Sequence, residues 1–332
     1  MWWALHDVRL SELLGHLRRA RPELFIAAIL AVTATFPLRT VRWRYLLRLE
    51  GVTLPFRPLW HATAIGFMAN NLLPARAGEF ARAYAARALT GVRFSTAFAS
   101  IVVERILDGM TLVALFAVAV IASDFPADSA IQGVSVERLA LFGGVAFGGL
   151  FVAALAVVRW PSLILGLARR LLRALMPARW AERVSDVLEG MVQGLGALRT
   201  PGSIVVVGFW SLVLWLVNGA SFWLALRAFG MGTDWSTALV VQGVIAFGVA
   251  VPSSPGYWGV FEAATRVSLG LYGIAASDAV SLAISYHVAG MLPITLLGLY
   301  SLGRAGLTLR TLQHAPGDDD APRPPASAAD NP

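Results

Sequence analysis

A group of polar residues between positions 70 and 82 interrupts an otherwise apolar part of the chain. Pro74 and Gly78 disfavour a continuous helix, so Arg76 should lie beside backbone N–H groups that begin a new helix. A helix N-terminus together with an arginine is a suitable receptor for a phosphate group. A loop whose charges meet water is the alternative interpretation. The candidate ligand-binding residues of this group are Asn70, Asn71, Arg76, Glu79 and Arg82.

A second polar group consists of Glu104, Arg105 and Asp108, and it lies inside a long apolar segment. Glu104 and Asp108 are one helical turn apart and therefore share a face. Charged side chains within a membrane are costly, and they usually face a partner or a watery cavity. The group therefore predicts either a role in binding substrate or protons, or a structural ion pair with Arg76 or Arg82.

A second break in an apolar stretch lies between residues 252 and 262. Pro252 and Pro255 end a helix, whereas Gly256 and Gly259 allow the backbone to approach a ligand closely. A tight turn at the membrane interface is the alternative. The candidate binding residues at this break are Ser253, Ser254 and Glu262.

The remaining polar positions favour structural roles. Trp and Arg are common anchors at a membrane interface, and we interpret residues 42–44 in this way, with contact to a lipid headgroup as the alternative. His61 and His287 should be hydrogen-bonded residues within the helical bundle. No spacing of His, Asp or Glu predicts a metal site, and we expect no catalytic residue and no cofactor.

The composition is typical of a membrane protein. Of the 332 residues, 57% are hydrophobic and only 14% are charged, whereas about a quarter are charged in soluble globular proteins. The basic residues are all arginine, and the net charge is +7. Without a basic soluble domain, this charge indicates cytoplasmic loops and anionic lipid headgroups rather than nucleic acid. The absence of cysteine excludes disulfides and thiolate catalysis.

Helices that cross or enter the membrane must position these groups. Residues 61–73 and 237–251 are too short to span it and end at proline, so each is predicted to be a re-entrant or broken helix beside a cavity. The expected fold is all-α, a polytopic membrane helical bundle of about five to seven spans. The five clearest spans are residues 24–47, 95–122, 139–158, 203–229 and 279–302.

The loop charges predict the orientation and the domain boundaries. The arginine-rich linker at residues 159–202 and the C-terminus are expected in the cytoplasm, and residues 123–137 outside. Residues 1–21 are predicted to form an amphipathic interfacial helix, residues 22–313 the transmembrane domain, and residues 314–332 a disordered tail. This orientation places the N-terminal arginines outside, which is uncommon. Either an additional N-terminal span is missing from the chain, or the surface helix is an exception to the rule.

The two broken segments have similar surroundings. Pro74 is matched by Pro252 about 180 positions later, with weaker matches on both sides. The matches define repeat-like halves at residues 24–158 and 203–310, in inverted topology because an odd number of crossings separates them. Paired broken helices in inverted repeats are typical of a transporter site near the membrane midplane. Chance similarity in an Ala- and Gly-rich chain is the alternative.

In their order along the chain, these motifs resemble the transmembrane region of lysylphosphatidylglycerol synthases. The same region occurs alone in a broad set of uncharacterised, flippase-like bacterial membrane proteins. The resemblance implies a lipid-translocating region without the aminoacyl-transferase domain, and one further helix before residue 1. It covers roughly residues 11–309 and is carried by residues 42–44, 71–82, 104–108 and 255–262.

Residues and resemblance together predict a lipid flippase or transporter of the bacterial inner membrane. Arg76 and Arg82 would hold the phosphate of a headgroup between the two broken helices. Glu79, Glu104 or Asp108 would neutralise these arginines or a cationic headgroup. The expected partners are membrane lipids of the phospholipid, polyprenyl-phosphate-linked or hopanoid type. The alternative functions are a membrane-embedded lipid-modifying transferase and an accessory subunit of a lipid-biosynthesis complex. The protein could also form a homo-oligomer or bind a partner enzyme of lipid synthesis.

Overall fold

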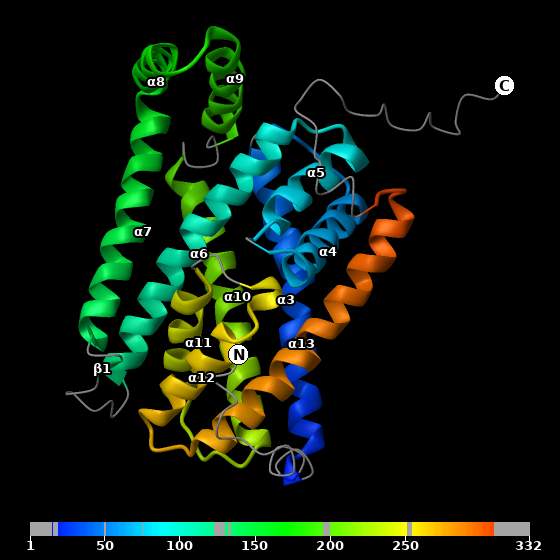
Figure 1. Cartoon of the computed structure of the whole chain (residues 1–332), viewed down its shortest axis with the longest axis vertical. Coiled ribbons are helices and arrows are strands. Elements are labelled where there is room, and N and C mark those ends of the chain that lie inside the picture. The colour runs from blue at the N-terminus through cyan, green and yellow to red at the C-terminus, as the bar shows by residue number, and fades with distance from the viewer. Residues whose placement is uncertain are drawn as a thin grey trace, which may run out of the picture.

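The computed structural model describes residues 15, 19–49, 51–74, 76–122, 130–131, 134–194, 200–250 and 254–308. The predicted tail, most of the predicted N-terminal helix, Pro252 and Ser253 lie outside these residues. The described residues form a bundle of helices (Figure 1). Their strands are two residues long, β1 (Ala130–Ile131) and β2 (Val134–Ser135), and they pair antiparallel.

Among the described residues, four helices are long and apolar enough to cross a membrane. A fifth crossing results if α7 (Val136–Arg159) and α8 (Pro161–Leu175), whose axes differ by 101°, are counted as one bent span. The predicted polytopic all-α bundle is therefore confirmed. The described residues contain four or five spans, where five is the lower limit of the expected range and four is one fewer. The four long helices are α3 (Pro22–Leu49), α6 (Phe94–Ala122), α10 (Pro201–Ala228) and α13 (Ala276–Arg304).

Each half of the chain places two short helices between two long ones. The lengths are 28, 17, 13 and 29 residues in the first half and 28, 16, 11 and 29 in the second. The first helices of the two halves are antiparallel, because the N–H of Arg21 beside α3 donates to the carbonyl of Ala228 at the end of α10 (2.8 Å). An inverted repeat requires this arrangement. The short helices are α4 (Phe56–Leu72), α5 (Gly78–Thr90), α11 (Trp235–Ala250) and α12 (Val260–Gly270).

Helices α4 and α5 pack closely because two glycines face each other. A Cβ atom on Gly78 would lie 2.1 Å from the carbonyl oxygen of Gly66, so only glycine fits at that position. The side chain of Asn70 accepts a hydrogen bond from the N–H of Gly78 over 2.8 Å. Asn70 therefore joins the two helices, and its role in ligand binding stays a prediction.

Replacement of Gly78 by alanine is expected to destabilise the protein by about 1–3 kcal/mol or more, because the new methyl group collides with backbone. The measurement is the apparent thermal unfolding midpoint of the purified protein in detergent. Gly208 in α10 has open space around its missing Cβ. Gly208→Ala should leave the midpoint unchanged or raise it, because alanine has a higher helix propensity than glycine. Equal midpoints for the two variants would contradict the packing described here.

The second break lies against the first. After α11, the short 3₁₀ helix η2 (Pro255–Tyr257) leads into α12. Gly256 has a φ of 61°, and a Cβ atom there would lie 3.1 Å from the carbonyl oxygen of Asn71 at the end of α4. Gly259 has a φ of 87° immediately before α12. Glycine is favoured at both positions because other residues rarely adopt positive φ, and the turn that results brings the two breaks together.

The two largest clusters of the described apolar core lie at opposite ends of α3. One cluster at the C-terminal end of α3 includes Leu47, Leu59 and Leu302. A second cluster at the N-terminal end of α3 includes Ala28 and Leu226. The linker between the halves forms α8 and α9 (Ala178–Gly194), which stand at one end of the molecule in Figure 1.

Candidate functional site

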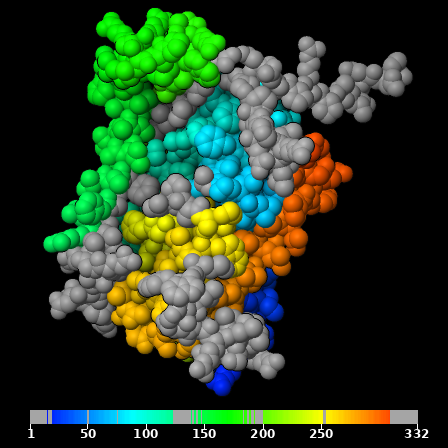
Figure 2. Space-filling view, in the orientation of Figure 1, coloured from blue at the N-terminus to red at the C-terminus, as the bar shows by residue number. Residues whose placement is uncertain are grey.

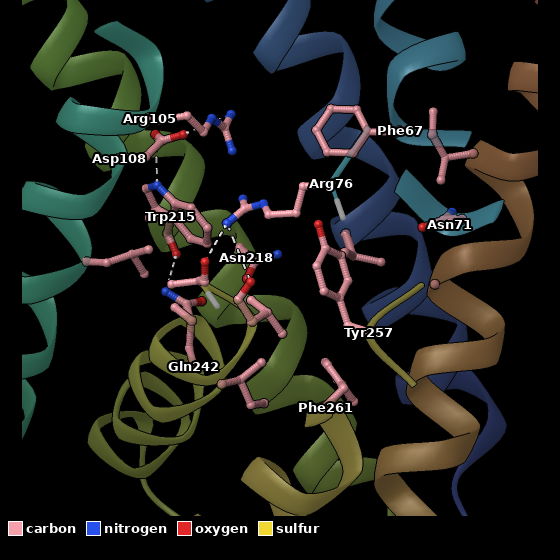
Figure 3. A pocket seen from close by; sticks show the side chains of 18 of the residues that line it. Phe67, Asn71, Arg76, Arg105, Asp108, Trp215, Asn218, Gln242, Tyr257 and Phe261 are labelled. Atoms are coloured by element: carbon pink, nitrogen blue, oxygen red, sulfur yellow. Dashed lines mark hydrogen bonds and ion pairs between the residues drawn. The ribbon is translucent and has the colours of Figure 1, made fainter. Parts of the chain in front are cut away.

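A cavity of about 590 Å³ lies between the two halves (Figure 3). Helices α3 to α6 of the first half and α10 to α13 of the second contribute to its wall. Most of the wall is apolar, with aromatic rings such as Phe67 and Phe222. Five residues predicted from the sequence line it: Asn71, Arg76, Glu79, Arg105 and Asp108. The lining residues that sequence analysis did not select as ligands include Trp215, Asn218, Gln242, Tyr257 and His287.

The side chain of Arg76 connects the two breaks. Its Nη1 donates to the carbonyls of Val249 (3.4 Å) and Ala250 (3.2 Å) at the C-terminal end of α11. Its Nη2 lies 3.4 Å from Oε1 of Glu79, and the side chain is 28% exposed. Arg76 has a φ of 57°, which is uncommon for a residue with a side chain and is found mostly where the surroundings enforce it. The guanidinium thus points into the cavity from a constrained backbone.

Arg42 is the centre of a buried ion-pair network. It is 0% exposed, makes a bidentate pair with Asp108, and its Nη2 lies 3.1 Å from Oε1 of Glu104. Its neighbour Trp43 is also 0% exposed and donates through Nε1 to Ser100 Oγ (2.8 Å). The prediction that this segment anchors the protein at the interface is therefore wrong for these two residues, because α3 faces the interior of the bundle here.

Glu104 binds three arginines, so the structural ion pair considered as an alternative is present. Arg82 donates to both of its oxygens (3.0 and 3.3 Å) and lies over the ring of Trp43, 3.9 Å from the centroid. Arg105 reaches Glu104 and also Asp108, at 3.3 Å from the latter. Arg82 and Glu104 do not line the large cavity, whereas Arg105 and Asp108 do. The network thus connects the cavity wall to the packing of α5 on α6.

The charges around the cavity do not cancel among the described residues. Arg39 adds a further positive charge. Its guanidinium lies between the rings of Phe67 (5.3 Å) and Trp215 (5.2 Å), and its Nη1 is 3.7 Å from Oδ2 of Asp108, an acid that Arg42 and Arg105 also contact. Its Nε and Nη1 are buried without a hydrogen-bond partner among these residues. Buried cations without enough acidic partners favour an anionic ligand. The group has five arginines and three acids: Arg39, Arg42, Arg76, Arg82, Arg105, Glu79, Glu104 and Asp108.

Neutral polar side chains line another part of the cavity. Trp215 donates to Oδ1 of Asp108 (2.9 Å), and Gln242 donates to the carbonyl of Trp215 (3.3 Å). The Oε1 atom of Gln242 is buried and has no partner among the described residues. Tyr257 lines the same cavity. Asn218 lies beside these residues (Figure 3). For Asn218 and Gln242, the only signal in the sequence was a single amide side chain inside an apolar segment.

Glu262 lies beside the cavity and serves as a helix cap. It is buried, accepts the N–H of Gly259 (2.6 Å), and pairs with Nδ1 of His287 (2.7 Å). His287 is thus a hydrogen-bonded bundle residue as predicted, and it also lines the cavity. His61 likewise bonds Ser301 (2.9 Å). The hydroxyl of Ser254, expected to bind ligand, donates to a backbone carbonyl within its own turn.

The stability of the wild-type protein relative to Glu262→Gln is expected to depend on pH. Burial alone would raise the pKa of Glu262, but hydrogen bonds from His287 and from backbone N–H groups outweigh it and hold the pKa below its usual range. A carboxylate whose pKa is lower in the folded state stabilises the protein fully above its pKa in the unfolded state, about 4.3. This stability is lost as the pH falls from there through the pKa of the folded state. Unfolding midpoints of both proteins between pH 3 and pH 7 test this, and a constant difference would contradict it.

Comparison with known proteins agrees with a membrane role. Residues 1–298 match the family described as "Lysylphosphatidylglycerol synthase TM region". A protein named "Glycosyltransferase AglD" from Haloferax volcanii is 30% identical, over 77% of this chain but only 45% of its own length. Two proteins named "UPF0104 membrane protein" from Methanothermobacter thermautotrophicus are 25% and 23% identical and are covered over 80% and 88% of their lengths. No solved structure matches significantly.

These matches and the apolar helices define the protein at the level of family and location. The chain is a multi-pass membrane protein with a lipid-related family membership. The match to the family extends from the N-terminal residues into α13, so it includes both breaks and the buried ion-pair network. The chain belongs to the family of the lysylphosphatidylglycerol synthase transmembrane region.

Proposed function

We propose that the protein moves a lipid with an anionic or phosphate-linked headgroup across the membrane, through the cavity between its two halves. The observation that carries the proposal is an excess of arginine directly behind a cavity wall that is otherwise largely apolar. Arg76 and Arg105 on the wall are matched by Glu79 and Asp108, and the additional arginines belong to the buried ion-pair network next to it. Arg76 and Arg105 reach the cavity and are suited to phosphate oxygens. The apolar wall can contact the part of the lipid where the headgroup joins the acyl or isoprenoid chains.

The arrangement of the short helices supports this proposal. In it, α4 with α5 and α11 with α12 enter the membrane from opposite sides as re-entrant pairs, and their breaks meet at the cavity. Backbone that is not hydrogen-bonded within a helix is tolerated at such depth only beside protein or water. Broken helices in inverted repeats form the substrate sites of many transporters. The antiparallel α3 and α10 and the contact between Gly256 and Asn71 provide the geometric basis.

We further propose that the end of the bundle with α8, Arg48 and Arg304 faces the cytoplasm of a prokaryotic cell, in its inner membrane. The described arginines concentrate at this end, at the termini of α3, α7 and α13, and positive charge favours the cytoplasmic side. Labelling of single cysteines introduced at Arg304 and Asp278, at the two ends of α13, tests this orientation in spheroplasts. Access to Arg304→Cys from outside the cell would contradict it.

Transport is tested by reconstitution into liposomes with fluorescent analogues of phosphatidylglycerol, a polyprenyl phosphate and neutral phosphatidylcholine. A membrane-impermeant reductant then measures how much of each analogue reaches the outer leaflet. We expect accelerated exchange of the anionic analogues and little effect on phosphatidylcholine. Protein that accelerates none of the three would overturn the proposal.

A lipid-modifying role is the second candidate, because one relative is named a glycosyltransferase. The chain spans less than half of that relative, so the region described here could serve a transferase domain as its membrane partner. Incubation of the purified protein with a sugar-nucleotide donor and a polyprenyl phosphate distinguishes the two roles. Formation of a glycolipid by this chain alone would favour catalysis over transport.

A further inference from the structure

Helix α8 presents an apolar stripe that the described part of the protein leaves uncovered. Leu163, Leu167, Leu171 and Leu175 recur at every fourth position, which places them along one side of the helix. Their exposed fractions are 68%, 65%, 59% and 73%, and Trp160 before the helix is 54% exposed. Figure 2 shows α8 and α9 projecting from the end of the molecule. A contiguous exposed apolar surface of this kind marks an interaction site.

Positive charge borders this stripe. Arg170 and Arg173 are exposed beside the leucines, and α8 has no acidic residue. Arg169 pairs with Glu189 of α9, which connects α8 to its neighbour. Long arginine side chains can extend from an apolar surface so that the charge reaches lipid headgroups. The stripe and its border therefore suit a surface that is apolar inside and anionic outside.

The orientation of α8 relative to α7 supports a membrane surface as that partner. Helix α7 has 24 residues and is therefore about 36 Å long, which is sufficient to cross the hydrocarbon region. Its sides are also apolar and exposed, for example at Phe142 and Val152. The chain then turns by 101° into α8. If α7 is near the membrane normal, α8 lies nearly in the plane of the membrane, at the depth where α7 ends.

We propose that α8 lies in the headgroup region of the membrane and binds anionic lipids. Its leucine stripe inserts at the boundary between headgroups and acyl chains, and Arg170 and Arg173 contact anionic headgroups. The site is separate from the central cavity, because no residue of α8 lines that cavity. The result of its test is therefore independent of whether the protein transports lipid.

The natural chain has no cysteine, so single-cysteine variants can be labelled uniquely. Leu167→Cys places a nitroxide on the stripe, and Ser162→Cys places one on an exposed position outside it. Both full-length variants are reconstituted into vesicles of phosphatidylglycerol and phosphatidylcholine. We expect the Leu167 label to collide more with oxygen than with a water-soluble nickel chelate, and the Ser162 label to show the reverse. Equal access of the chelate to both labels would overturn membrane insertion.

A second measurement tests the preference for anionic lipid. A fluorophore at Leu167→Cys should be quenched several-fold more by spin-labelled phosphatidylglycerol than by spin-labelled phosphatidylcholine at equal mole fraction. Addition of Arg170→Gln and Arg173→Gln should remove most of this difference. Equal quenching without these changes would overturn the anionic preference. A Leu167 label that neither oxygen nor the chelate reaches would show that protein, a second copy or another partner, covers the stripe, which would also overturn the proposal.

Discussion

Replacement of Arg76 by alanine is expected to slow the transport of an anionic lipid analogue by about ten-fold or more, because one charged hydrogen-bonding group contributes about 1.5–3 kcal/mol. Arg76 is the predicted phosphate ligand that lies at the junction of both breaks. The same variant loses the contacts to α11, so the distance between the halves would change as well. The measurement is the initial rate of leaflet exchange in liposomes with equal protein content.

Two control variants separate these effects. Arg76→Lys keeps the charge but loses the planar, multiple donors of arginine, so it should retain part of the rate. Arg57→Ala removes an exposed arginine from the first turn of α4, away from the cavity, and should leave the rate unchanged. An Arg76→Ala protein that is folded and transports at the wild-type rate would contradict a role of Arg76 in transport.

Replacement of Glu104 by leucine is expected to destabilise the folded protein by about 3–5 kcal/mol. The carboxylate neutralises Arg42, Arg82 and Arg105, and its side chain is fully buried. Without it, Asp108 is the remaining acid of the buried network, so uncompensated positive charge stays in a region of low dielectric constant. The apparent thermal unfolding midpoint in detergent and the yield of monodisperse protein report the effect.

A surface ion pair provides the comparison for this variant. Glu189 pairs with Arg169 where both side chains are more than a third exposed, so Glu189→Gln should cost no more than about 1 kcal/mol. The double variant Arg82→Leu/Glu104→Leu should recover part of the loss, because it removes a cation together with the acid. A midpoint for Glu104→Leu that equals that of Glu189→Gln would show that the network does not stabilise the fold.

The sequence by itself determined that this is a membrane protein and where its helices are interrupted. An apolar segment of sufficient length can be recognised without knowledge of its neighbours, because the bilayer sets the length. Proline and glycine disturb a helix locally, so the two breaks could also be located. The polar positions Arg76, Glu79, Arg105 and Asp108 were selected for the same reason: a charge in an apolar segment needs compensation, whatever the partner is.

Only the tertiary structure decided what each of these groups contacts. The residues around Arg42 in the sequence are typical of an interfacial anchor. Arg42 is buried because α3 packs against α6 and α10. Glu262 and Arg76 are both charged residues at a break, but Glu262 is bound by a helix N-terminus and His287, whereas Arg76 reaches the cavity. Contacts between residues more than a hundred positions apart arise from helix packing, and the local pattern of a segment does not contain that information.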